Sequence, residues 1–571
     1  MFSRLPNTAR EFMALPWSQT EPFFQELIDF QLNSTNLKEW LGQWTGVNNL
    51  VMESLFRFRL ETSQDTTNQQ AQRHYQAFLD DIYPKFKIAD QRLKDKLLSS
   101  GLKPDAFDIP LRNMQTEAAL FCEENVPLLS DELKLSNEFD KILGAQTITW
   151  DGAEVSITQL RPVYQDPDRD RRQQAWRSVA QRQLADREAI NNLWRQFMEL
   201  RAKLAANAGF HTYRDYRWMD LLRFDYTPQD CHEFHQAIEE VVVPAAKRIY
   251  ENRCMRLGLE SLRPWDLEVD PLTRPALRPF QDEDELQLKA CSIFHRVDPQ
   301  LGKHFETMRQ EGLLDLENRK GKAPGAYCTS FPAAGRPFIF MNAVGLHDDV
   351  QTLLHEAGHA FHFFEKNHLP YHQQSRVPME FNEVASMSME LLASPYLTKS
   401  AGGFYTTEQA ARARIDHIEG IILFWPYMAV VDAFQHWVYE NHESATNPSN
   451  CDAVWAELWN RFMTGVDWSG LEQEMMTGWQ RKLHIHKYPF YYVEYGLAQV
   501  GAVQVWKNAL EDQAKSVGNY RHAISLGGTV TLPELFTAAG ARFSFDKTTM
   551  NNLICTLEYC LADLERSIST G

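Results

Sequence analysis

The residues with the clearest chemical potential are His355, Glu356 and His359, which stand in the run His-Glu-Ala-Gly-His. On a helix, residues four positions apart share a face, so the two imidazoles can point at one metal ion. Glu356 beside them could take a proton from a metal-bound water. With 18 histidines in 571 residues, composition alone would give this spacing in roughly a few chains per hundred. The spacing indicates zinc hydrolysis if its surroundings agree.

The segment around this run is predicted to be a helix with one buried side. Asp348 and Gln351 have the spacing of an N-terminal capping box, with Asp in the place of the hydroxyl residue. His362 follows His355 by seven residues and could be a third ligand, although a packing or supporting role is favoured. Apolar residues recur at helical intervals after the cap: Leu353, Leu354, Ala357, Ala360, Phe361 and Phe364.

A catalytic zinc needs a third protein ligand and a position for water. The best candidates lie on the helix predicted from Met379 onward, where Glu383 and Glu390 share a face. On the residues alone, Glu383 and Glu380 both remain candidates, with Glu383 preferred. Glu390 could hydrogen-bond a ligating histidine from behind, and solvated helix carboxylates are the alternative explanation.

A second unusual segment, Leu483 to Gly496, is rich in histidine and tyrosine. Acyl transfer at zinc generates an oxyanion, which neutral imidazole or tyrosine hydroxyl donors would stabilise. From composition alone an aromatic core helix is the better explanation.

Helical periodicity dominates the rest of the chain, and there is no βαβ alternation, phosphate-binding loop or repeat. A hairpin is predicted over 146–157 about Asp151-Gly152, and a strand over 336–342. The proline-rich stretch 263–280 is expected to be a long loop. The predicted amphipathic helices are 22–46, 66–100, 169–207, 228–257, 281–297, 407–445 and 451–465.

Charge and cysteine content exclude several classes of protein. A net charge of −18 and a pI near 5.5 argue against nucleic acid or an anionic membrane as the partner. The eight cysteines form no CxxC pair, which argues against a disulfide scaffold or a cysteine-rich zinc site. Without a signal-peptide pattern or a long apolar run, we expect a cytoplasmic protein with no membrane contact. We expect an N-terminal helical region, 1–190, and a helical catalytic region, 191–571.

Taken together, these segments resemble the M3 family of metallopeptidases, in particular its oligoendopeptidase F branch, which includes Pz-peptidases. The resemblance covers about residue 195 to about residue 560, and its ordered motifs are highly specific as a set. They are Gly325–Cys328, Pro337–Ile339, Asp348–Val350, His355–His362, Phe381–Ser386 and Pro489–Gln499, with a weaker one at Arg201–Phe210.

The resemblance implies one zinc ion per chain, held by His355, His359 and Glu383. It implies that Glu356 is the general base and later the proton donor to the leaving amine.

The same resemblance gives His484 a role in contacting substrate and stabilising the tetrahedral intermediate. Tyrosines among Tyr491, Tyr492 and Tyr495 would share that role, without one being singled out.

The implied fold is a mainly α-helical, two-lobed zincin-like body that encloses a deep channel, with a small β-sheet beside the zinc helix. The strand over 337–342 would pair with the substrate backbone. The expected activity is zinc-dependent endopeptidase hydrolysis of short oligopeptides. A zinc exopeptidase, a non-catalytic peptide-binding protein and a purely structural helical protein are the alternatives, and the sequence leaves the oligomeric state unknown.

Overall fold

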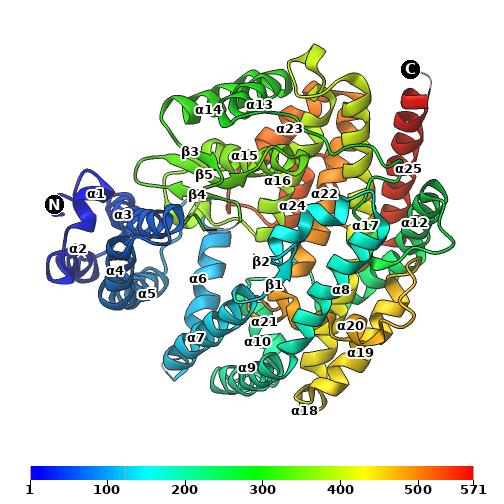
Figure 1. Ribbon diagram of the computed structural model, residues 1–571. Helices are drawn as coiled ribbons and strands as arrows, with labels where there is room; N and C mark the ends of the chain where they lie inside the picture. The colour runs from blue at the N-terminus through cyan, green and yellow to red at the C-terminus, as the bar shows by residue number, and fades with distance from the viewer. Residues whose placement is uncertain (1, 123, 320, 324, 570–571) are drawn as a thin grey trace. The chain divides into compact units, whose positions relative to one another are not determined.

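The computed structural model describes residues 2–122, 124–319, 321–323 and 325–569. These residues are mostly helical, with one two-stranded hairpin and one three-stranded sheet (Figure 1). The prediction of a mainly α fold with a small sheet is therefore confirmed. Residues 1, 570 and 571, at the ends of the two expected regions, lie outside the described residues.

Contacts divide the chain into two compact units, each assembled from separate stretches of sequence. The first comprises Met1–Ala119, Leu277–Ala411 and Ala498–Phe543. The second comprises Leu120–Ala276, Arg412–Leu497 and Ser544–Gly571. The boundary expected at residues 190 and 191 lies inside α9 (Arg187–Asn207). The division into 1–190 and 191–571 therefore differs from these units and stays a prediction.

The first unit contains the N-terminal helices α1 (Ala9–Met13), α2 (Trp17–Asp29), α3 (Leu37–Gln64), α4 (Gln69–Ala77), α5 (Tyr83–Ser100) and α6 (Asp108–Leu120). The prediction of one helix over 22–46 is wrong, because α2 and α3 are separate. Asn33 lies between them, and its side-chain oxygen accepts hydrogen bonds from the backbone N–H of Thr35 at 2.9 Å and of Asn36 at 3.3 Å. This local turn satisfies the backbone without a continuous helix.

The sheet of the first unit has the strand order β3-β5-β4, formed by β3 (Leu314–Glu317), β4 (Tyr327–Phe331) and β5 (Arg336–Ala343). The predicted strand over 336–342 is thus confirmed as β5. It is the central strand, parallel to β3 and antiparallel to β4. Since both its edges are occupied, the expectation that this strand pairs with substrate is wrong. Within the described residues, β4 has one sheet partner.

Helix α15 (His347–Lys366) lies against this sheet and against α16 (Met379–Ala393) (Figure 1). The prediction of Asp348 as its N-cap is wrong by two positions, because the N-cap is Leu346 and the helix begins at His347. Asp349 Oδ2 accepts from the backbone N–H of Val344 and of Leu346, both at 2.8 Å. The turn before the helix therefore sets its start. The other helices of this part are α13 (Glu283–Val297), α14 (Pro299–Gln310), α23 (Gln513–Ser525) and α24 (Leu532–Ala538).

The second unit begins with α7 (Asn125–Gly144) and the hairpin of β1 (Thr147–Trp150) and β2 (Ala153–Ser156). Asp151 and Gly152 have φ of 50° and 80°, as a tight hairpin turn requires, so the predicted hairpin is confirmed. Further helices are α8 (Arg169–Ala185), α9, α10 (Tyr213–Asp220), α11 (Pro228–Ala237), α12 (Val243–Leu257), α18 (His442–Ala445), α19 (Pro448–Phe462), α20 (Glu472–Met476), α21 (Leu483–His486) and α25 (Lys547–Ser569). Helices α17 (Thr407–Glu440) and α22 (Tyr492–Glu511) contribute residues to both units, as does α6 through its last residue, Leu120.

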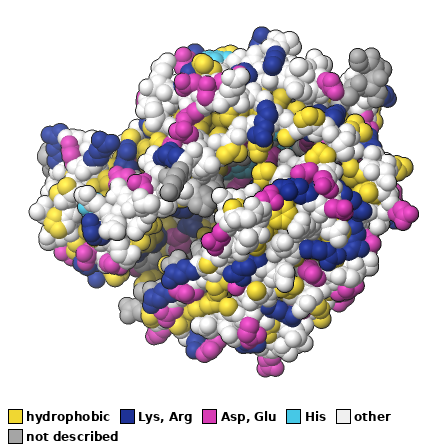
Figure 2. Space-filling view, in the orientation of Figure 1, with side chains coloured by type: hydrophobic (Ala, Val, Ile, Leu, Met, Phe, Trp, Pro, Cys, Tyr) yellow, Lys and Arg dark blue, Asp and Glu magenta, His cyan; other side chains and the backbone are white. Residues whose placement is uncertain are grey.

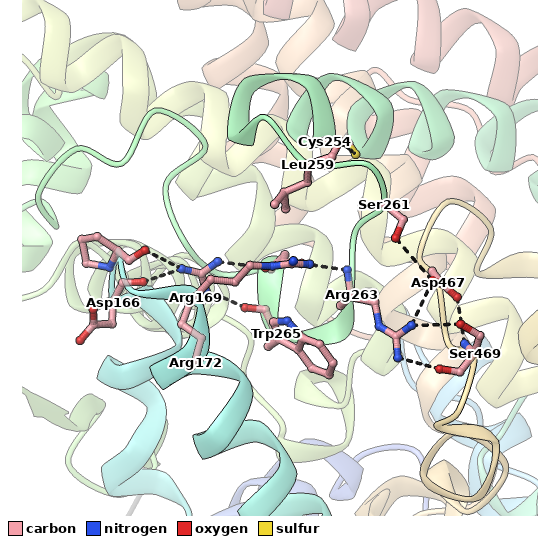
Figure 3. Close-up of polar contacts among 12 residues, drawn as sticks. Asp166, Arg169, Arg172, Cys254, Leu259, Ser261, Arg263, Trp265, Asp467 and Ser469 are labelled. Carbon is pink, nitrogen blue, oxygen red and sulfur yellow. Dashed lines mark hydrogen bonds and ion pairs between the residues drawn. The ribbon is translucent and has the colours of Figure 1, made fainter.

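The proline-rich stretch is anchored by a buried ion-pair network. Asp266 is fully buried and accepts from Arg169 at 2.7 Å and Arg172 at 2.9 Å, both on α8. Arg263 donates to Asp467 at 3.0 Å, and Figure 3 shows this link toward the loop of Asp467. From residue 267 to residue 282 the chain has no helix or strand, as predicted.

Helix α17 is long and apolar enough to cross a membrane by length and composition, yet 61% of its most apolar window is buried inside the molecule. That burial is typical of a core helix.

On the face shown in Figure 2, basic and acidic side chains are interspersed.

Candidate active site

The structure brings His355 and His359 of α15 together with Glu383 of α16, and their donor atoms lie within 4.8 Å of one another. Oε2 of Glu383 lies 3.4 Å from Nε2 of His355 and 3.6 Å from Nε2 of His359. Zinc bonds of about 2.0–2.1 Å in a tetrahedral arrangement separate neighbouring ligand atoms by about 3.3–3.4 Å. The three residues therefore fit a zinc ion. Glu380, the rival on the residues alone, is not in this donor set.

A close approach of the two helices positions Glu383. A Cβ on Gly358 would lie 2.6 Å from Cα of Ser386 and 2.8 Å from the carbonyl oxygen of Ala385, so glycine is required there. Tyr520 donates to the same carbonyl at 2.9 Å. Ser386 Oγ donates to Glu383 Oε2 at 3.0 Å and fixes the carboxylate.

Glu390 supports His355 from behind, as expected, with Oε1 2.7 Å from Nδ1. Burial opposes charge on His355, but Glu383 and Glu390 outweigh it and hold its pKa well above the ordinary value. The two carboxylates next to this imidazole therefore favour a positive charge at its position. Burial lowers the pKa of His359 to about 4, which leaves this imidazole neutral, as a ligand must be.

Glu356 is buried next to this donor set. Burial, aided by Glu383 and opposed by His355, raises its pKa to about 7. The backbone of Cys328 in β4 hydrogen-bonds this carboxyl group. Oε2 is buried without a hydrogen-bond partner among the described residues, so it can accept a proton from a water molecule.

His362 lies outside the donor set. It is 2% exposed, and its ring packs edge-on against Phe381 at a centroid distance of 6.4 Å. The packing role favoured from the sequence agrees with this position.

In the second unit, His484 of α21 lies at the centre of a tyrosine cluster. Its ring centroid is 4.9 Å from that of Tyr492, 5.8 Å from Tyr491 and 6.0 Å from Tyr495. Tyr491 and Tyr495 are themselves 5.2 Å apart. The four residues predicted to stabilise the oxyanion are therefore neighbours of one another.

The environment of this cluster keeps His484 and Tyr492 neutral. Burial, with a smaller effect of Lys482, lowers the pKa of His484 to about 3. Nδ1 of His484 is buried without a hydrogen-bond partner among the described residues. Burial also raises the pKa of Tyr492 far above its ordinary value. A neutral imidazole and a neutral phenol are the donor types that an oxyanion needs.

Residues remote in sequence hold this segment, and no local pattern in the sequence predicts them. Phe490, just before α22, has φ of 63°, a strained value for a bulky residue. Its N–H donates to Oε1 of Gln435 at 2.7 Å. Glu494 pairs at 2.7 Å with Arg223, and both side chains are nearly fully buried. The one hint in the sequence is that Glu494 is an acidic residue within an aromatic run, where a buried carboxylate would need a basic partner.

Known proteins with similar sequences are peptidases, and a peptidase is what the geometry of this site suggests. The sequence profile of peptidase family M3 matches residues 163–553. An oligoendopeptidase F homolog of Borreliella burgdorferi is 24% identical over 331 residues, which are 55% of this chain and 53% of that protein. The match thus spans about half of that relative's length.

Solved structures match nearly the whole chain. Pz peptidase A, solved with an inhibitor, has a TM-score of 0.86 and 26% identity, and the match covers 99% of this chain and 98% of that chain. A protein described as an oligoendopeptidase F has a TM-score of 0.87 and 27% identity, with 98% of each chain covered.

Proposed function

Because the chain belongs to peptidase family M3, we propose that it is a zinc-dependent endopeptidase that hydrolyses short oligopeptides. One observation carries this proposal. A buried carboxyl group with an unpartnered oxygen, Glu356, stands beside three donors whose spacing fits zinc, His355, His359 and Glu383.

In this proposal His355, His359 and Glu383 hold the ion. A zinc ion bound there would lower the pKa of its water and polarise the scissile carbonyl. Glu356 takes the proton from the attacking water at Oε2 and delivers it to the leaving amine nitrogen. A pKa of about 7 for Glu356 suits a group that both accepts and donates a proton near neutral pH.

We assign the stabilisation of the tetrahedral intermediate to His484 with Tyr491, Tyr492 and Tyr495. Their N–H and O–H groups would donate hydrogen bonds to the oxyanion. Because these donors are uncharged, no charged side chain has to be removed from water. No single tyrosine is chosen, because all three surround the imidazole.

The substrate backbone would add to the sheet at β4 and not at β5, whose edges are both paired. Cys328 of β4 hydrogen-bonds Glu356 through its backbone, so a peptide on this edge would lie near the proposed base. Main-chain pairing gives affinity that does not depend on which side chains the peptide carries, and this suits an oligopeptidase.

We place the enzyme in the cytoplasm, where reducing conditions suit its eight free cysteines.

The test is cleavage of internally quenched peptides of graded length, blocked at both ends, with products mapped by mass spectrometry. We expect internal cleavage that a chelator abolishes and zinc restores. The variant Glu356→Gln should keep its zinc and lose about 10²–10⁴-fold in kcat.

Three results would contradict the proposal. Cleavage only of peptides with a free terminus would indicate an exopeptidase. Full activity of Glu356→Gln would exclude the role of this carboxylate. Peptide binding without turnover by the zinc-loaded protein would indicate a binding protein.

A further inference from the structure

A second group of histidines and carboxylates lies in the second unit, and the proposed peptidase chemistry does not use it. Asp432, His436 and Glu440 are spaced four apart on α17 and so share a face. His232 and His235 stand three apart on α11. The donor atoms of His232, His436 and Glu440 lie within 4.8 Å of one another. This spacing suits a bound ion.

His436 is the most unusual member. It is fully buried, between the rings of Trp218 at 5.9 Å and Phe490 at 5.2 Å. Nδ1 has no hydrogen-bond partner among the described residues, and Nε2 faces the carboxylate of Asp432 at 3.4 Å. Because an unsatisfied buried polar group is costly, this imidazole points to a ligand.

Asp432 supplies the supporting carboxylate. It is fully buried, with Oδ2 2.9 Å from Nε2 of His235 and 3.4 Å from Nε2 of His436. Burial opposes its charge, yet His436 and His235 hold its pKa below the ordinary value. With Nε2 of His436 directed at Asp432, Nδ1 is the ring nitrogen left for an ion. A carboxylate behind a histidine is the arrangement that orients metal-ligating imidazoles in proteins.

The group opens to solvent on the side of His232 and Glu440, whose side chains are 41% and 42% exposed and 3.7 Å apart. Both line a cavity of about 440 Å³, so an ion can enter. Arg214 forms an ion pair with Glu440, and Arg461 forms one with Glu239 at the same cavity. These cations disfavour calcium or magnesium, which rely on carboxylate charge. Imidazoles favour zinc, nickel or copper.

We propose that His232, His436 and Glu440 form a second metal site, which binds a transition-metal ion of the zinc type, with Asp432 orienting His436. The site does not depend on the proposed peptidase activity.

The test measures zinc content. Untagged protein is stripped with a chelator, reloaded with Zn²⁺, desalted and analysed by mass spectrometry of the metal. We expect two ions per chain in the wild type and one in His232→Ala, whose half-exposed side chain can be removed without disturbing the core. The exposed His211 of the same unit provides the matched control, and His211→Ala should keep two ions. Asp432→Asn should weaken the second ion about 10–100-fold in a chelator competition.

The variant His359→Ala separates this proposal from the proposed function. It should keep one ion, and the pair His232→Ala, His359→Ala should keep none. A wild type with a single ion that His359→Ala loses would overturn the second site, as would His232→Ala with two ions. A single ion that His232→Ala loses and His359→Ala retains would support the second site and overturn the catalytic one.

Discussion

Gly358 of α15 lies so close to Ser386 of α16 that an added Cβ would stand 2.6 Å from the Ser386 Cα. The residue between the base and the second histidine thus sets the distance at which Glu383 faces the two imidazoles. The glycine of the His-Glu-Ala-Gly-His run is a packing requirement, and the spacing of the three candidate metal ligands depends on it.

Replacing Gly358 with Ala should therefore push the two helices apart. Overpacking of this kind costs about 1–3 kcal/mol, which a lower midpoint of urea unfolding would report. Zinc affinity should fall as well, because Glu383 moves with α16. Gly420→Ala in α17 is the control, since nothing lies within 4 Å of its added Cβ. A Gly358→Ala protein as stable as the wild type, with unchanged zinc affinity, would contradict this explanation.

Glu390→Gln tests the support of His355. The carboxylate accepts from Nδ1 of His355 at 2.7 Å, and loss of such a partner costs about 10–100-fold in metal affinity. Competition with a chromogenic chelator measures the change. The exposed Glu457 of α19 serves as the control, and Glu457→Gln should bind zinc like the wild type. Equal affinities for both variants would show that Glu390 does not orient the ligand.

His484→Ala tests the assignment of the oxyanion donor. Removal of one such donor costs about 10²–10³-fold in kcat, while zinc content and KM should change little. Tyr488→Phe is the control on the same segment, because Tyr488 is 47% exposed. A rise in KM with an unchanged kcat would assign His484 to substrate binding alone.

Local periodicity made much of the candidate metal site predictable. His355, His359 and Glu356 lie within one helical turn and a half, and Glu383 and Glu390 share a face of the next long helix. Spacing left Glu380 as a rival of Glu383, and the family resemblance decided between them. The start of α15 was missed by two residues, because Asp349 caps a turn formed by the residues before it.

Long-range pairing was not predictable from spacing. β5 was recognised as a strand, but its central position depends on β3 and β4, which pair with it only in the folded sheet. His232 and His436 are 204 residues apart (436 minus 232), so no local spacing brings them together. Arg223, the partner of Glu494, is equally remote in sequence. Such groups become visible only when the helices are packed.

Asp315 makes the stability of the first unit depend on pH. Burial would raise its pKa, but hydrogen bonds from Arg319, Lys322 and Gln64 lower it to about 2. A lowered carboxyl pKa stabilises the fold above the unfolded value of about 3.9, and this stabilisation is lost as the pH falls toward 2. The shift corresponds to about 2 kcal/mol at neutral pH.

We expect Asp315→Asn to be less stable than the wild type at pH 7, because it leaves the buried ammonium of Lys322, 0% exposed, without its carboxylate. The gap between the two proteins in urea midpoint should shrink as the pH falls from about 5 to about 2, since protonation removes the same charge in the wild type. Asp284→Asn, at an exposed position of α13, should show no such convergence. A gap that stays constant over this range would mean that Asp315 contributes through packing and not through its charge.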